Sequence, residues 1–208
     1  MPILFYSLHK DFVRKMNSHF PCFEKKIEQY KPSSNNIVKT YYVSPANSMG
    51  YMHGGIDYSL ANNILIGIAP RVLSRIQTIG KPIPNYHEKY LPIGSSTIVD
   101  YNRHASLVVA PTMLTPSNVS KTHNAYYATM AVLYNILVNR QHDIRNVDIL
   151  LTSFCCGCGG MSSDETVQQM LDAIQDYNDM SKYNPRVIDN NTIICEPNMD
   201  EQFQSSST

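Results

Sequence analysis

The sequence predicts an α/β protein, a three-layer α/β/α sandwich built around one mixed, mostly parallel sheet. Short runs of apolar and β-branched residues alternate along the chain with segments whose apolar residues recur every three or four positions. This alternation is typical of strands joined by crossover helices, which cover both faces of a sheet. The composition agrees with a packed domain, because 43% of the 208 residues are hydrophobic and only 16% are charged.

The expected strands are short runs of apolar, β-branched or tyrosine residues. Pro45 and Pro111 each follow such a run, and proline cannot donate a backbone hydrogen bond to continue a strand. The apolar run 147–152 is typical of a central strand that helices cover on both faces. The predicted strands are 3–7, 37–43, 97–99, 106–110 and 147–152.

The expected helices have apolar residues at three- or four-residue spacing. The strongest pattern begins at Thr122, and its apolar and tyrosine side chains then repeat every three or four positions as far as Val138. Residues 162–165 offer both serine caps and acidic charge, which favour the N-terminus of the last helix. The predicted helices are 8–20, 56–65, 70–79, 122–138 and 162–177.

We expect a single domain over residues 1–195 and a polar tail over 196–208, because the chain contains no internal repeat or convincing linker. No apolar run approaches the roughly 20 residues of a membrane helix, so no membrane partner is expected. Five cysteines, three of them within 155–158, favour reduced thiols and an intracellular, cytoplasmic location. Basic and acidic residues both number 17, so the chain lacks the positive field that nucleic-acid binding relies on.

Two glycine-rich loops follow predicted strands and lead into predicted helices, over residues 44–57 and 152–161. Ligands of α/β proteins bind on such loops, where glycines let backbone N–H groups approach and a helix N-terminus favours negative charge. Neither loop has the phosphate-binding P-loop or dinucleotide-binding signature. The two loops therefore predict a clasp for a diphosphate, with a pair of tight turns as the alternative.

The ordered set of motifs resembles the macrodomains, a superfamily that binds ADP-ribose. Residues 44–48 followed by 54–57 are similar to the first ligand loop of that family, and 157–161 are similar to its second loop. The resemblance spans roughly residues 38–177 and is closest to a macrodomain-like branch that includes phage tail-associated proteins, which suggests a viral or phage origin. The other similar segments are 91–95, 108–113, 122–126 and 168–170.

The resemblance implies roles for individual residues. Asn47 would bond the distal ribose, Gly54 to Ile56 would present N–H groups to the diphosphate, and Asp57 would orient a water as in hydrolytic macrodomains. The candidate catalytic residues are therefore Asp57 and Asn47. The candidate ligand-binding residues are Ser44, Ala46, Asn47, Gly54, Gly55, Ile56, Cys156, Gly157, Cys158, Gly159 and Gly160. No cofactor or metal is expected.

Each candidate also has a structural interpretation. The helix dipole favours an acidic residue such as Asp57 in a first helical turn, and Asn47 could cap its own loop. His53 is expected to be a loop histidine. The cysteines at 155, 156 and 158 are expected to pack around a tight turn, because so close a run cannot easily aim three thiolates at one ion.

The sequence thus predicts a protein that binds ADP-ribose or a related nucleotide and that could hydrolyse ADP-ribosyl linkages on a protein or metabolite. One alternative is a catalytically silent assembly module that retains the fold. Another is a pocket for a different nucleotide or an RNA end, since no Gly-Asp-Ile occurs near residues 28–30 and a basic rim could be formed by Lys81, Lys89, Arg103 and Lys121. The oligomeric state is left open.

Overall fold

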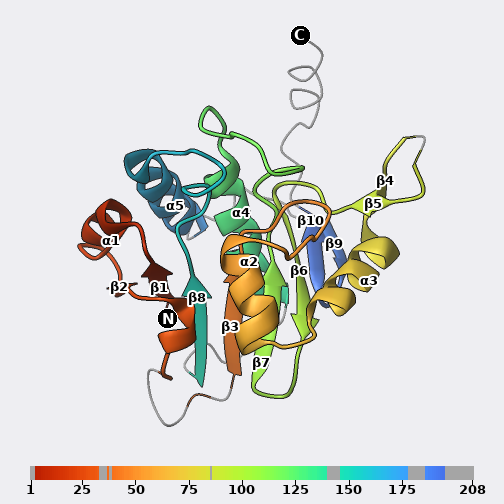
Figure 1. Ribbon diagram of the computed structural model, residues 1–208, viewed down its shortest axis with the longest axis horizontal. Helices are drawn as coiled ribbons and strands as arrows, with labels where there is room; N and C mark the ends of the chain where they lie inside the picture. Colours follow the sequence, from red (N-terminus) through yellow and green to blue (C-terminus); the bar gives the residue numbers. More distant parts are fainter. Residues whose placement is uncertain are drawn as a thin grey trace.

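The computed structural model describes residues 3–32, 37, 39–84, 86–139, 146–177 and 186–194, and an eight-stranded sheet lies at its centre (Figure 1). The strands of this sheet are β1 (Ile3–Ser7), β2 (Cys22–Glu24), β3 (Lys39–Ser44), β6 (Ser95–Asp100), β7 (Ala105–Val109), β8 (Val147–Leu151), β9 (Arg186–Asp189) and β10 (Thr192–Ile194). A separate hairpin consists of β4 (Lys81–Pro82) and β5 (Lys89–Tyr90). The α-helices are α1 (Lys10–Met16), α2 (Gly55–Ser59), α3 (Ala69–Ile79), α4 (Asn124–Leu133) and α5 (Ser163–Tyr177). The other helical segments are the 3-10 helix η1 (Ile27–Gln29) and the π-helical segments η2 (Leu60–Ile64) and η3 (Tyr134–Asn139).

The sheet is mixed and mostly parallel, as the sequence predicts. Its strand order is β2-β1-β8-β3-β7-β6-β10-β9. The first five strands in this order run parallel to one another. The remaining neighbours pair antiparallel, from β7 to β6 and on to the edge at β9. Residues 147–151 form the strand between β1 and β3, so the prediction of a central strand there is confirmed.

Helices cover both faces of the sheet and complete the three-layer α/β/α fold (Figure 1). On one face, α1, α4 and α5 pack around Phe5, Ile149 and Leu151. On the other face, η2 and α3 pack against Leu107 and Leu150. Neighbouring residues of β8 thus belong to different cores, as expected for a strand whose side chains alternate between two buried faces.

The first helix is shorter than the prediction of 8–20. It begins at Lys10 and ends at Met16, and Leu8 lies before it with 64% of its surface exposed. The apolar spacing extended the prediction past both ends because Leu8 and Phe20 happen to continue the helical period. Phe20 instead lies in the turn toward β2, where its ring packs against Phe5 at 5.9 Å.

Five short strands are not found by a search for apolar runs. In β2 and β9 most residues are exposed, and β10 and the β4–β5 hairpin are only two or three residues long. Strand β6 begins earlier than the predicted 97–99 because its first two residues, Ser95 and Ser96, are polar yet completely buried. The predicted tail, 196–208, lies outside the described residues. Among the helices that are described, none has the length and apolar character needed to span a bilayer.

A buried carboxylate ties the amino-terminal strands to the centre of the sheet. Asp148 of β8 is fully buried, and the Tyr30 hydroxyl donates a hydrogen bond of 2.6 Å to its Oδ2 atom. The Tyr30 ring also lies edge-on to Tyr6 and Tyr42, at 6.1 and 6.0 Å. A buried carboxylate needs such partners, because an unpaired one would lose its hydration without compensation. This cluster therefore holds Tyr30, at the end of η1, against β8, β1 and β3.

Replacing Tyr30 with phenylalanine should lower the free energy of unfolding by about 1.5 kcal/mol, since a buried acceptor loses its donor. The matched control is Tyr42→Phe, whose hydroxyl has no hydrogen-bond partner among the described residues and whose ring belongs to the same cluster. Urea denaturation of both variants measures the difference. Equal stability of the two variants would contradict the importance of the bond to Asp148.

Candidate functional site

The two predicted loops lie at the same edge of the sheet. Strands β3 and β8 are parallel neighbours, with Tyr42 opposite Leu150, so both strands end at the edge from which the loops emerge. The first loop runs from Pro45 to Gly54 and leads into α2, and the second runs from Thr152 to Ser162 and leads into α5. The expectation that the glycine-rich loops follow neighbouring strands is confirmed.

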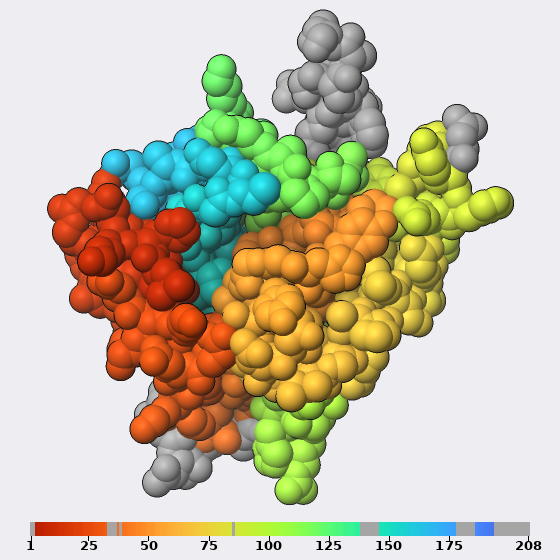
Figure 2. All heavy atoms as spheres, viewed as in Figure 1, coloured from red at the N-terminus to blue at the C-terminus, as the bar shows by residue number. Residues whose placement is uncertain are grey.

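A third loop, after β7, connects the other two. The backbone N–H of Ser48 in the first loop donates to the carbonyl of Met113 at 2.8 Å. The N–H of Val119 donates to the carbonyl of Gly159 in the second loop, also at 2.8 Å. In Figure 2 the orange first loop, the green segment after β7 and the cyan second loop adjoin one another on the visible face. Sequence reasoning missed this connection, because these backbone bonds leave no pattern in the side chains.

The glycines of the two loops separate into two kinds. A Cβ atom added at Gly54, Gly55 or Gly157 would meet no heavy atom within 4 Å, so these positions face open space. A Cβ atom at Gly159 would lie 2.5 Å from the Cys155 carbonyl oxygen, and one at Gly160 would lie 2.8 Å from Asn118 Nδ2. Three candidate glycines are therefore open to a ligand, whereas Gly159 and Gly160 are required by packing.

The side chain of Asn47 is engaged within its own loop. Its Nδ2 donates to the carbonyl of Tyr51 at 2.9 Å, and its Oδ1 accepts from the backbone N–H groups of Met49 and Tyr51 at 3.1 and 3.3 Å. These bonds are the ones that the loop-capping interpretation of Asn47 predicts. Asn47 therefore fixes the position of Tyr51, and it is 92% buried, with 8% of its surface exposed.

Asp57 lies in the first turn of α2, as predicted, but its side chain points toward the sheet. Only 8% of the residue is exposed, and its Oδ1 accepts a 2.5 Å hydrogen bond from the Oγ of fully buried Ser44. Burial raises the pKa of Asp57 to about 6, and the hydrogen bond from Ser44 lowers the pKa by a smaller amount. Such a carboxyl group titrates close to neutrality and can exchange a proton under ordinary conditions.

A second polar group lies on the same face of the sheet. Thr152 follows β8 directly, two residues after Leu150, as Ser44 follows two residues after Tyr42. Side chains two residues apart share a face of the sheet, so Ser44 and Thr152 project from adjacent strands toward the layer of α2. The Thr152 Oγ1 atom is buried without a hydrogen-bond partner. The sequence search overlooked Thr152, which has no motif of its own.

The remaining candidates are less accessible. Ala46 is 1% exposed, and its carbonyl accepts the N–H of Thr112 at 2.9 Å, so its contribution is to hold the first loop against the third. Ile56 is half-buried. Met52 is 3% exposed and packs in the core beneath the loop, whereas His53 is exposed, as predicted.

Cys155 and Cys156 pack around the turn of the second loop as expected, whereas Cys158 does not. Cys155 is buried, has a φ of 61°, and burial raises the pKa of its thiol to about 12. The Cys156 thiol donates to Thr166 Oγ1 at 3.2 Å, and burial raises its pKa as well. Only Cys158 among these three is exposed. Within the described part of the chain, no group of three or more His, Cys, Asp or Glu side chains is placed to hold a metal ion.

The cations considered for a basic rim do not share one edge of the sheet. Lys121 lies in the loop that follows β7, at the edge of the sheet from which the two glycine-rich loops emerge. Arg103 lies in the turn that precedes β7 and is therefore at the opposite end of that strand. Lys81 and Lys89 belong to the separate hairpin. This arrangement does not favour an RNA-end pocket bounded by all four.

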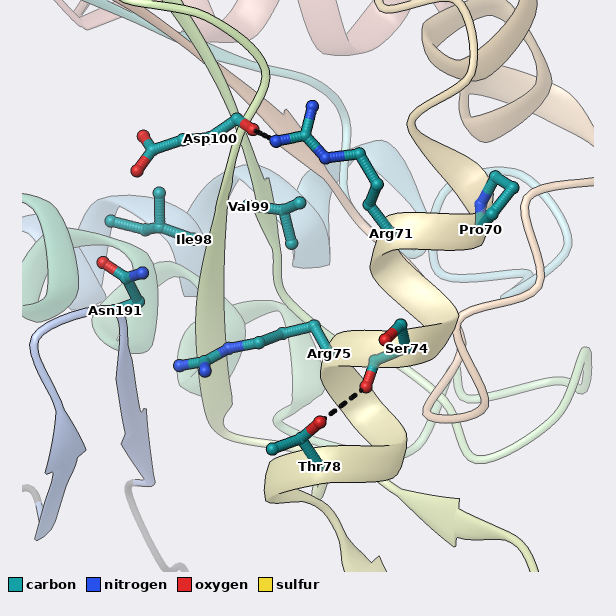
Figure 3. Close-up of a pocket in the computed structure, with 9 residues that line it drawn as sticks. All are labelled: Pro70, Arg71, Ser74, Arg75, Thr78, Ile98, Val99, Asp100 and Asn191. Atoms are coloured by element: carbon teal, nitrogen blue, oxygen red, sulfur yellow. Dashed lines mark hydrogen bonds between the residues drawn. The ribbon is translucent and has the colours of Figure 1, made fainter.

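A cavity of about 520 Å³ lies outside both loops, between α3 and β6 (Figure 3). Its arginines are bonded within the protein. Arg75 Nη2 donates to both carboxylate oxygens of Asp189 at 2.6 Å, and Arg71 donates to the backbone carbonyls of Asp100 and Tyr101. These bonds join α3 to the antiparallel end of the sheet, so we assign this groove a role in holding the layers together.

No protein-family model matches the chain, and the comparison with curated protein sequences finds no match. The functional interpretation therefore depends on the geometry at the edge of the sheet and on the pattern of residues there. The best supported site is the edge formed by the first and second loops, where Gly54, Gly55 and Gly157 are open and Asp57 is buried two residues after Gly55.

Proposed function

We propose that the protein binds ADP-ribose or a related nucleotide, with the diphosphate held between the first and second glycine-rich loops. The observation that carries this proposal is the pairing of β3 with β8, which brings the open glycines Gly54, Gly55 and Gly157 to one edge of the sheet. A ligand can approach the backbone closely where no Cβ atom is present. The order of motifs along the chain, which resembles that of macrodomains, supports the same ligand.

The start of α2 supplies suitable donors. The first N–H groups of a helix lack acceptors within it and carry partial positive charge. Here they belong to Gly55, Ile56 and Asp57, and the helical turns continue from α2 into η2 without a break. The N–H groups of Gly55 and Ile56 are therefore the proposed contacts for phosphate oxygens.

Hydrolysis of an ADP-ribosyl linkage is the catalytic part of the proposal. Asp57 is the candidate general base, because its pKa of about 6 leaves the carboxylate mostly ionised at neutral pH yet able to take up a proton. Its hydrogen bond from Ser44 at 2.5 Å fixes the orientation of the carboxyl group. Turnover of ADP-ribosylated protein should consequently be lost in an Asp57→Asn variant that still binds ADP-ribose.

A second candidate function is an assembly module that retains the fold and binds no nucleotide. Two observations favour it. The side-chain amide of Asn47 forms hydrogen bonds with the backbone of Tyr51 in its own loop, and Met52 is buried in the core beneath that loop. Both contacts hold the first loop in place without any ligand. The two candidates differ in whether a nucleotide stabilises the folded protein.

The deciding experiment is thermal unfolding with ADP-ribose, AMP and ribose 5-phosphate. A ligand at 100 times its Kd should stabilise the native state by about 2.7 kcal/mol. For a domain of this size that corresponds to a rise in Tm of roughly 5–10 °C. Such a rise with ADP-ribose supports the nucleotide site, whereas an unchanged Tm at millimolar concentrations of all three ligands favours the assembly module.

The proposed diphosphate site can be tested by a change of charge at Gly54. Its backbone is extended, with φ at −150°, and a Cβ atom there meets nothing, so Gly54→Glu should fold normally. The added carboxylate should repel the diphosphate and remove most of the ligand-induced rise in Tm. Gly54→Gln is the matched control, since it has the same size without the charge. Equal ligand binding by both variants would place the diphosphate elsewhere.

A further inference from the structure

We propose that the exposed rings of Tyr51 and His53 form a stacking platform for the base of the bound nucleotide. This inference rests on the proposed function and deepens it, because it assigns the base to a particular surface. The two rings lie nearly parallel, at an interplanar angle of 11° with their centroids 6.0 Å apart. Both residues are exposed, Tyr51 with 40% of its surface accessible, whereas residues 46–50 and Met52 of the same loop are buried.

The backbone that carries Tyr51 is fixed in place. The Asn47 Oδ1 atom accepts a hydrogen bond from the Tyr51 N–H, and its Nδ2 atom donates one to the Tyr51 carbonyl. Met52, the next residue, is buried in the core. An exposed aromatic ring on a loop that is fixed before binding loses little conformational freedom when it contacts a ligand. Asn47 thus serves as a positioning residue for the ring.

The surroundings of the ring suit a nucleotide. The third loop meets the first loop three residues before Tyr51, where the Ser48 N–H bonds the carbonyls of both Met113 and Leu114, and Leu114 is 41% exposed. Along the chain, Gly54 follows His53 directly and faces open space. A base on the rings would therefore have its sugar and phosphates directed along the same loop toward the open glycines.

The chemistry of the platform favours a nucleobase over a sugar alone. Planar aromatic side chains stack on the face of any base, and this contact tolerates differences between bases. The platform offers a pair of nearly parallel aromatic rings. We therefore expect selection for a ligand that contains a base, with modest discrimination between adenine and other bases.

The test measures binding of ADP-ribose, AMP and ribose 5-phosphate to Tyr51→Ala and Tyr51→Phe by titration calorimetry. Tyr51→Ala should weaken the two base-containing ligands by about tenfold or more, within the range measured for loss of one aromatic stack. Binding of ribose 5-phosphate should be unchanged, and Tyr51→Phe should bind all three normally. Tyr86→Ala is the control, because Tyr86 is 72% exposed in the connection between β4 and β5.

The possible outcomes separate this inference from the proposed function. If the unchanged protein binds none of the three ligands, the proposed function and the platform both fail. If it binds ADP-ribose and Tyr51→Ala binds it equally well, the nucleotide site stands and the platform is wrong. If Tyr51→Ala has a lower Tm without ligand and loses all three ligands together, the ring supports the loop instead of the base, and the platform is again wrong.

Discussion

Replacing Asp57 with asparagine is expected to stabilise the protein at pH 7 by up to roughly 3 kcal/mol and to leave stability almost unchanged at pH 4. The carboxyl group is buried, and burial raises its pKa to about 6 from the ordinary value of 3.8. A difference of two pH units between the folded and unfolded pKa corresponds to nearly 3 kcal/mol, at about 1.4 kcal/mol for each unit. Asparagine has no charge to bury and can still accept the hydrogen bond from Ser44.

The direction of the pH dependence follows from the raised pKa. Folding favours the protonated form of Asp57, so its contribution to stability is fully present below a pH of about 4 and is lost as the pH rises through about 6. The difference in unfolding free energy between Asp57→Asn and the unchanged protein should therefore grow between those two values and then stay constant. Denaturant unfolding across pH 4 to 8 measures it.

Asp11→Asn serves as the control, because Asp11 lies on α1 with 73% of its side chain exposed. The unfolding free energy of Asp11→Asn should differ little from that of the unchanged protein at every pH. An Asp57→Asn variant that is less stable than the unchanged protein at pH 7 would contradict the cost that we assign to the buried charge. A stabilising substitution at a candidate catalytic residue is consistent with the common conflict between stability and activity.

Gly159→Ala is expected to destabilise the protein by about 3 kcal/mol, at the upper end of the range for overpacking. The new Cβ atom would lie 2.5 Å from the Cys155 carbonyl oxygen and 2.9 Å from Val119 Cγ2. Neither contact is relieved easily. The Cys155 carbonyl accepts the N–H of Met161, and the Gly159 carbonyl accepts the N–H of Val119, so a shift in either direction breaks a backbone bond of the loop.

Gly157→Ala provides the matched control within the same loop. Its Cβ atom meets nothing within 4 Å, so the change in unfolding free energy should stay within about 0.5 kcal/mol. Thermal or urea unfolding of the two variants, followed in parallel, measures the contrast. Similar destabilisation by both would indicate that the second loop is held less tightly by Val119 and Cys155 than the contacts imply.

The sequence predicts the elements that bury apolar residues at a regular period and misses those that do not. The predicted bounds of β8 and α5 lie close to the observed ones, and the predicted helix 122–138 covers α4 together with η3. Extensive apolar burial leaves a strong signal in these segments. Strand β6 was predicted too short, since buried Ser96 and Asn135 satisfy each other through hydrogen bonds instead of apolar packing. Exposed β9 leaves almost no signal.

The candidate site was predicted in position but not in detail. Glycines after two strands are visible in the sequence, and the parallel pairing of those strands brings their loops together. Which glycines are open could not be predicted, because Gly159 is enclosed by Val119, a residue of the third loop. The inward orientation of Asp57 depends on Ser44, thirteen residues earlier, and no local rule joins the two.

The order of strands in the sheet has a consequence for biosynthesis. β8 pairs with both β1 and β3, and the bond between Ser7 and Ser153 joins residues 146 positions apart. While the chain emerges from the ribosome, β8 is synthesised long after β1 and β3. Until then, the edges of β1 and β3 that will pair with β8 have no partner strand. Contacts so distant in sequence slow folding, and unpaired edges invite association with other chains. The nascent protein should therefore depend most on chaperones just before residues 147–151 emerge.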